Sequence, residues 1–511
     1  MTITKKVLVL VLLSLLTIGG CYFRAQRLAG VEGKLGEDET RLMLAAEGVL
    51  TTGLPTMPSG KIYLRGALSS YLTAASLWLF GRDDFAARLP NALAGALLIP
   101  LFFVFGRALG GTTAGFCLAL FAAVQPELIK WSANAWMTML FIVVFIGAAY
   151  LLYLGYERDR PPMQVAGAAA GLFAVLAHEL GALLAVAVAL ALAIRAARRD
   201  FGWFSGSRSV AALLILGFSL ILVVALGLFL RLGTVVGSTG EFKHYIDPYL
   251  SLDRLLIDYK RWRGGYLPLA AAAILGIPLL LRSLRSGGLF LYMIMAVTCM
   301  TVWVIIGKTS ERYGLVLLPV LALAATWALA EVARLVSGWQ RIGARTALAF
   351  RAVVFVVAFG ASLHRDLLAA TQRPDPPTET WLTEFRSLGA APGDLVLCDN
   401  PEIPAWYLGR VDYWDRGPNY ERYSYISGNQ IRHLYTGAVR VGSEEDFFRL
   451  IEANETKILW YLGKEPALKI LSPHVRSRLL GSPQRLRRTR DEQIILRIDL
   501  SALDWMRVKG N

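Results

Sequence analysis

The sequence predicts an α-helical polytopic membrane protein with about eleven spans, followed by a C-terminal α/β soluble domain. Apolar residues make up 55% of the 511 residues, charged residues make up 18%, and the mean hydropathy is +0.49. A soluble fold could not bury this much apolar surface, because soluble cores stop growing near about 250–300 residues. The apolar residues occur in blocks along 1–370, whereas 371–511 has the composition of a soluble protein. We therefore expect a transmembrane domain over 1–370 and a separate domain over 371–511.

The net charge of +15 has a different meaning here than in a soluble protein. In a soluble chain it would suggest nucleic acid, but much of it lies in short loops between apolar runs, as the positive-inside rule requires. The first apolar run, 7–20, follows Lys5 and Lys6 and has no small-residue cleavage site after it. We expect an uncleaved first span in the plasma (inner) membrane, with the N-terminus cytoplasmic, the C-terminal domain outside and no nucleic-acid partner.

The remaining spans follow from the requirement that basic loops alternate between the two sides. A polar outer loop reaches about residue 60, and 62–80 is predicted to be a helix lying along the membrane. Further spans are expected at 89–105, 115–124 with its flanks, 137–153, 213–230, 267–281, 289–306, 315–332 and 352–363.

The apolar run 163–194 is too long to be a single transmembrane helix. As one helix it would be about 48 Å long, whereas the hydrocarbon core of a membrane is about 30 Å thick. Its strong interruption is His178-Glu179, so two short spans with an outer turn at His178 fit better, and Arg198 then lies inside.

The tail alternates helices and strands after a proline-rich linker at 373–377, which predicts a small α/β layer domain. Ser443 is placed to cap a helix that ends at Glu452. Cys398 is the single cysteine of the tail, so a disulfide framework is excluded there. The other expected elements are helices at 378–388 and 465–471 and strands at 394–398, 456–462 and 493–498.

Three motifs resemble one family of enzymes. The first outer loop contains Glu37-Asp38-Glu39, residues 79–90 read LFGRDDFAARLP, and Arg312-Tyr313-Gly314-Leu315 precedes a proline-containing span. In order and spacing the first two resemble the C-type membrane glycosyltransferases of the protein-mannosyltransferase and aminoarabinose-transferase branch, over about the first 200 residues, and the third also resembles that family. The resemblance implies transfer of a hexose or pentose from a polyprenyl-phosphate donor to a lipid, glycan or protein acceptor at the outer membrane face.

By this resemblance Asp38 matches the family's catalytic aspartate, with Glu39 beside it. An acceptor hydroxyl or amine must lose a proton during transfer, and a nearby carboxylate can act as the base. The other interpretation is that Glu37, Asp38 and Glu39 solvate a loop or cap the following helix.

The departing polyprenyl phosphate is an anion, so cations should receive it. Lysine and arginine at span ends often snorkel to lipid headgroups instead, and a histidine between two apolar runs can be a simple turn residue. The candidates at the outer interface are Lys61, Arg65, His178, Lys308 and Arg312.

The sequence predicts no cofactor, and it leaves a divalent metal open. Relatives often carry an arginine or acidic residue in the loop after the third span, but here 131–136 contains neither. His178-Glu179 also lacks the second histidine of a zinc protease motif. The rival class is a transporter or lipid flippase without covalent chemistry, and a third is a binding protein that kept the fold and lost activity. Ionisable residues concentrate at the outer rim instead of mid-membrane, which favours an enzyme over a transporter.

Overall fold

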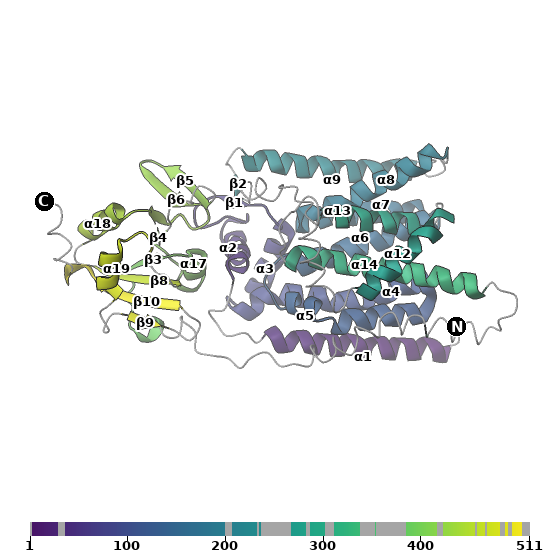
Figure 1. The fold of residues 1–511 in the computed structure, drawn as a ribbon, viewed down its shortest axis with the longest axis horizontal. Helices are drawn as coiled ribbons and strands as arrows, with labels where there is room; N and C mark the ends of the chain where they lie inside the picture. Colours follow the sequence, from purple (N-terminus) through teal and green to yellow (C-terminus); the bar gives the residue numbers. More distant parts are fainter. Residues whose placement is uncertain are drawn as a thin grey trace.

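A computed structural model of the protein places a helix bundle at one end and a β-sheet at the other (Figure 1). Helices α2 (Glu37–Thr52) and α3 (Ala67–Phe80) lie between them, and the N-terminus is at the end of the bundle far from the sheet. We call the two ends of the bundle the sheet end and the far end. The structure describes residues 3–28, 36–199, 207–231, 235–236, 267–282, 287–301, 311–337, 353, 385–415, 423–454, 457–464, 468–480, 486–488 and 493–502.

The second and third predicted spans form one helical hairpin. Helix α1 (Ile3–Leu28) packs along α4 (Asp84–Val124), whose 41 residues reverse direction at Gly111. Gly111 has φ +86°, a conformation that glycine adopts without the steric penalty of a side chain. The rings of Phe103 and Phe116 lie 4.9 Å apart, so the two halves of α4 pack against each other.

The predicted break at His178 is present. Helix α7 (Pro161–Ala177) ends there, His178 is extended, and the short helix η1 (Glu179–Ala182) leads into α8 (Leu183–Ala197). The chain folds back closely: a Cβ on Gly181 would lie 2.3 Å from the backbone nitrogen of Val175. The length argument therefore located this turn correctly.

The other described helices of the bundle agree with the predicted spans, although their number does not settle the span count. Five helical segments are at least 18 residues long and apolar enough to cross a membrane, and five shorter apolar helices accompany them in the described part. Most of the predicted outer loop 232–265 and, apart from residue 353, the predicted span 352–363 lie outside the described residues. The helices that agree are α6 (Thr138–Glu157), α9 (Ser207–Arg231), α12 (Leu267–Arg282), α13 (Gly287–Met300) and α14 (Glu311–Ser337), whereas the short helix α5 (Pro126–Ser132) lies between two predicted spans.

Basic residues gather at the far end, as the predicted inside loops require. Arg334, near the end of α14, donates from Nη2 to the Leu109 carbonyl oxygen at 3.1 Å, which ties α14 to the hairpin of α4. The end of α8 carries Arg198, which is exposed. This distribution supports a cytoplasmic far end, and the orientation stays a prediction.

Cysteine labelling tests that orientation. With the exposed Cys21 replaced by serine, a cysteine at the exposed Leu54 should react with an impermeant thiol reagent on intact cells. A cysteine at Arg198 should react only after permeabilisation, because the bilayer separates it from the reagent. Labelling of the Arg198→Cys protein in intact cells would reverse the predicted topology.

The first outer loop differs from its prediction in one detail, the start of the interfacial helix. The loop contains helix α2, and the interfacial helix begins at Ala67 instead of 62. Ile62 and Tyr63 form strand β1 (Ile62–Tyr63), which pairs in parallel with β2 (Val235–Val236). Helix α2 begins where the Glu39 carboxylate accepts the Gly36 N–H at 3.1 Å, and acidic residues in its first turn favour the helix dipole.

The tail forms an eight-stranded sheet in the order β5-β6-β7-β4-β3-β8-β10-β9. The central strands β7, β4, β3 and β8 are parallel, and antiparallel strands flank them on both sides. The strands are β3 (Leu395–Cys398), β4 (Tyr413–Asp415), β5 (Ser424–Ser427), β6 (Gln430–His433), β7 (Val439–Val441), β8 (Ile458–Lys464), β9 (Leu486–Arg488) and β10 (Gln493–Asp499).

The three predicted strands are present as β3, β8 and β10. Helix α18 (Glu444–Glu452) begins at Ser443, whose side chain accepts the Asp446 N–H as expected. The helix predicted at 465–471 is wrong in its described part, which is a turn, because the helix starts at a proline as α19 (Pro473–Leu480). Of the helix predicted at 378–388, residues 385–387 are described and helical. Helix α17 (Glu402–Leu408) was not predicted, and it contacts α2.

Candidate functional site

Asp38 lies in the first turn of α2, where the bundle meets the sheet domain. Its Oδ1 accepts a hydrogen bond from Nη1 of Arg41, one turn later in the helix, at 3.1 Å. Asp38 keeps 33% of its side chain exposed, whereas Arg41 keeps 7%. The carboxylate is therefore beside a fixed cation and still open to a reactant.

Arg41 also reaches the tail. Its Nε and Nη2 both lie 2.8 Å from Oε1 of Glu402, at the start of α17. The rings of Tyr435 and Tyr423 flank the guanidinium, with centroids 4.7 and 5.3 Å away. Sequence reasoning missed Arg41 and Glu402 as site residues, because the one visible signal was the three-residue spacing of Asp38 and Arg41 on a helix that was considered only as an alternative to a loop.

Glu39, predicted beside the base, holds α2 in place. Its Oε1 accepts the Ala135 N–H at 2.7 Å, and its Oε2 accepts the Gly36 N–H. Nε of Arg88, near the start of α4, lies 3.5 Å from Oε1. These contacts fasten the first turn of α2 to the 131–136 segment and to α4, so a direct catalytic role for Glu39 stays a prediction.

Arg65 and His178, two predicted phosphate ligands, come together through Glu179. Arg65 Nη2 lies 3.2 Å from Glu179 Oε1, and His178 Nδ1 lies 3.3 Å from Glu179 Oε2. The Arg65 guanidinium also lies 5.8 Å from the centre of the Trp136 ring, and His178 Nδ1 accepts the Leu180 N–H at 3.2 Å. This cluster is partly neutralised by Glu179, which sequence reasoning treated only as part of the turn.

The other predicted cations are not placed in this cluster. Lys61 turns toward the sheet domain, with Nζ 4.7 Å from the centre of the Tyr425 ring in β5. Lys308 lies outside the described residues, and Arg312 lies in the first turn of α14 with its side chain outside them.

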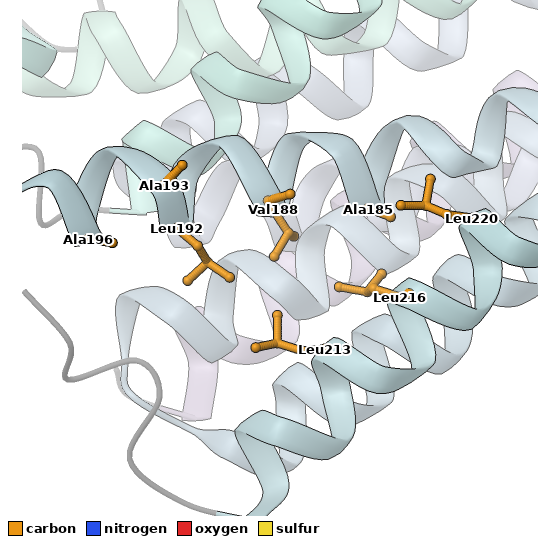
Figure 2. A pocket seen from close by; sticks show the side chains of 10 residues that line it. Ala185, Val188, Leu192, Ala193, Ala196, Leu213, Leu216 and Leu220 are labelled. Atoms are coloured by element: carbon orange, nitrogen blue, oxygen red, sulfur yellow. The ribbon is translucent and has the colours of Figure 1, made fainter.

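An apolar groove runs between α8 and α9, with a volume of about 330 Å³. Figure 2 shows Val188 and Leu192 of α8 facing Leu213 and Leu216 of α9 across it. Every lining residue is alanine, valine, leucine or glycine, so the groove suits hydrocarbon. It begins at Ala185, close in sequence to His178 and Glu179, and runs along α8 toward the far end.

A second cavity, of about 500 Å³, opens between the first outer loop and the sheet. Pro58 and Ser59 line one side, and Tyr413, Tyr425 and Arg432 are among the residues on the other. This cavity suits a polar group. Among the described residues, no three histidine, cysteine, aspartate or glutamate side chains lie together in an arrangement that could hold a metal ion.

Comparison with known proteins shows which family this fold resembles. Residues 65–227 match the family model of the dolichyl-phosphate-mannose-protein mannosyltransferases. The structure of ArnT from Cupriavidus metallidurans in the apo state matches with a TM-score of 0.59 and 15% identity, covering 98% of this chain and 99% of that one. The chain has the C-type glycosyltransferase fold. The resemblance to the protein-mannosyltransferase and aminoarabinose-transferase-like branch is thereby confirmed.

Two further structures carry lipid phosphates. ArnT from Cupriavidus metallidurans bound to undecaprenyl phosphate matches with a TM-score of 0.58 and 15% identity, over 97% of this chain and 98% of that one. The oligosaccharyltransferase AglB from Archaeoglobus fulgidus, in complex with an inhibitory peptide and a dolichol-phosphate, matches with a TM-score of 0.56 and 11% identity. That match covers 90% of this chain and 70% of AglB. No curated protein sequence gives a significant match.

Proposed function

We propose that this protein transfers a sugar from a polyprenyl-phosphate donor to an acceptor at the outer membrane face, with Asp38 as the base. The observation that carries this proposal is the position of Asp38: a partly open carboxylate, fixed by Arg41, at the junction of an apolar bundle and a soluble domain. A general base must be accessible to the acceptor, and its position must be fixed before the reaction begins. Both requirements are met by this residue.

Two features of the bundle support a site for the donor. A polyprenyl phosphate has an anionic head and a long hydrocarbon tail. Arg65 and His178 offer hydrogen-bond donors for the head, and the groove between α8 and α9 offers an apolar path for the tail. The polar cavity beside Ser59 offers space for the polar part of an acceptor.

Removing Arg65 tests the donor assignment. Arg65→Ala should raise the KM for the polyprenyl-phosphate sugar by about 10-fold or more, since hydrogen bonds to charged groups contribute about 1.5–3 kcal/mol. The measurement is transfer of labelled sugar by purified protein in detergent or nanodiscs, at a series of donor concentrations.

A double variant distinguishes the loss of phosphate binding from the effect of leaving the Glu179 carboxylate without Arg65. Arg65→Ala with Glu179→Gln removes the whole ion pair, so no charge is left without its partner. The exposed Arg82, which lies on the Trp406 ring, is the matched control, and Arg82→Ala should keep the donor KM. An unchanged KM in the double variant would remove Arg65 from the donor site.

A rival function, lipid flipping without chemistry, predicts movement of the donor between leaflets with its sugar still attached. The favoured function predicts release of polyprenyl phosphate and a glycosylated product. Mass spectrometry of membrane lipids and surface glycans, with and without the protein, distinguishes the two and identifies the sugar.

A further inference from the structure

The first outer loop and the C-terminal domain share one buried ion-pair chain. It runs from Glu402 on α17 through Arg41 to Asp38 on α2, with distances of 2.8 and 3.1 Å. The Glu402 side chain is 3% exposed and that of Arg41 is 7% exposed, so the chain is buried except at Asp38. Arg41 and Glu402, which are 361 positions apart in the sequence, therefore contact each other beside the proposed base.

The sheet domain encloses this chain on further sides. Tyr435 and Tyr423 flank the Arg41 guanidinium, and His433 Nε2 lies 3.7 Å from the same Glu402 oxygen that Arg41 contacts. The planar guanidinium directs its donors in fixed directions. With Nε and Nη2 on Glu402, the Nη1 edge of Arg41 points at Asp38.

Glu402 has two physical effects on Asp38. It fixes the orientation of Arg41, and it shares the positive charge that Arg41 directs at Asp38. Without Glu402 the buried Arg41 would lose one of its carboxylate partners, which is costly. Arg41 would then turn toward Asp38 and make that carboxylate a weaker base.

We infer that Glu402 of the C-terminal domain is a positioning residue for transfer, acting on Asp38 through Arg41. This inference rests on the proposed function and goes beyond it, because it makes the soluble domain part of the catalytic arrangement. Glu402 does not contact the reacting atoms. It orients Arg41, and Arg41 in turn orients Asp38.

The C-terminal domain also contacts the helix bundle at places away from Asp38. One of these contacts supplies a matched control for the loss of docking. The Tyr407 hydroxyl, on the same helix as Glu402, donates to Asp84 Oδ2 at 2.7 Å. Tyr407→Phe therefore removes one buried docking hydrogen bond and leaves the Glu402–Arg41–Asp38 chain intact.

The test compares Glu402→Gln, Glu402→Asp and Tyr407→Phe in the full-length protein. Glu402→Gln should lower kcat about 10–100-fold, because a displacement of about 1 Å in a catalytic group has an effect of this size. The donor KM should stay within about twofold, since Glu402 does not contact the donor. Glu402→Asp should recover part of the kcat, and Tyr407→Phe should keep it within about twofold.

A double variant distinguishes positioning from a loss of stability. If Glu402 acts through Asp38, Asp38→Asn with Glu402→Gln should be no slower than Asp38→Asn alone, whereas independent effects multiply. A normal kcat in Glu402→Gln, an equal loss in Tyr407→Phe, or a multiplied loss in the double variant would each overturn the inference. An inactive wild-type protein would instead count against the proposed function itself, and the inference would fall with it.

Discussion

Replacing Asp38 by asparagine should lower the rate of sugar transfer by about 10²–10⁴-fold and leave membrane insertion and donor binding nearly normal. Amide and carboxylate have almost the same shape, so the change removes basicity and charge with little effect on packing. A general base typically contributes about 10²–10⁴-fold to the rate, which corresponds to roughly 3–5 kcal/mol of activation barrier. Transfer of labelled sugar should be followed in membranes at matched protein levels.

The neighbouring acidic residues are the controls for this experiment. Glu37→Gln should be mild, because no part of the proposed mechanism uses Glu37. Glu39→Gln should lower stability, because both Glu39 oxygens accept backbone N–H groups. Near-normal turnover by Asp38→Asn would remove this residue from the mechanism and restore the interpretation of an acidic helix start.

Replacing Arg24 by alanine should strongly destabilise the bundle. Arg24 is buried in α1 and donates to the carbonyl oxygens of Gly20 and Ala122, each at 2.9 Å, and to the Ser132 hydroxyl at 3.1 Å. The Ala122 carbonyl lies in the last turn of α4, where no further helical N–H is available. Removing the guanidinium should cost about 2–4 kcal/mol, since buried acceptors lose charged donors.

The melting temperature in detergent and the yield of folded protein measure this effect. Arg27→Ala, one turn farther along the same helix and only half buried, is the matched control and should be mild. An Arg24→Ala protein with wild-type melting temperature would show that the contacts between α1, α4 and α5 do not depend on Arg24.

The parts of the fold that could be predicted have local physical causes. The turn at His178 follows from the length of an apolar run compared with the membrane, and Ser443 follows from helix capping. Strands β8 and β10 are long enough to show a pattern of β-branched, aromatic and leucine residues. Strands β4, β5, β6, β7 and β9 have only three or four residues each, too few for a period to appear.

The candidate site could be predicted only as a set of residue types. Asp38 was visible from its motif, but Arg41 and Glu402 are 361 positions apart in the sequence, and only the docking of α17 on α2 brings Glu402 to the Arg41 that holds Asp38. Arg65 was visible as a cation, and its pairing with Glu179 was not. Such contacts depend on tertiary packing, which no local pattern encodes.

Reconstitution with a doubly labelled donor tests the central claim most directly. The purified full-length protein in liposomes would receive a polyprenyl-phosphate sugar labelled in both the sugar and the lipid, together with an extract of cell-envelope acceptors. The account predicts that the two labels separate, with polyprenyl phosphate released and the sugar recovered on an acceptor, and that Asp38→Asn prevents this. Movement of both labels together across the bilayer, with the sugar–phosphate bond intact and unaffected by Asp38→Asn, would contradict it.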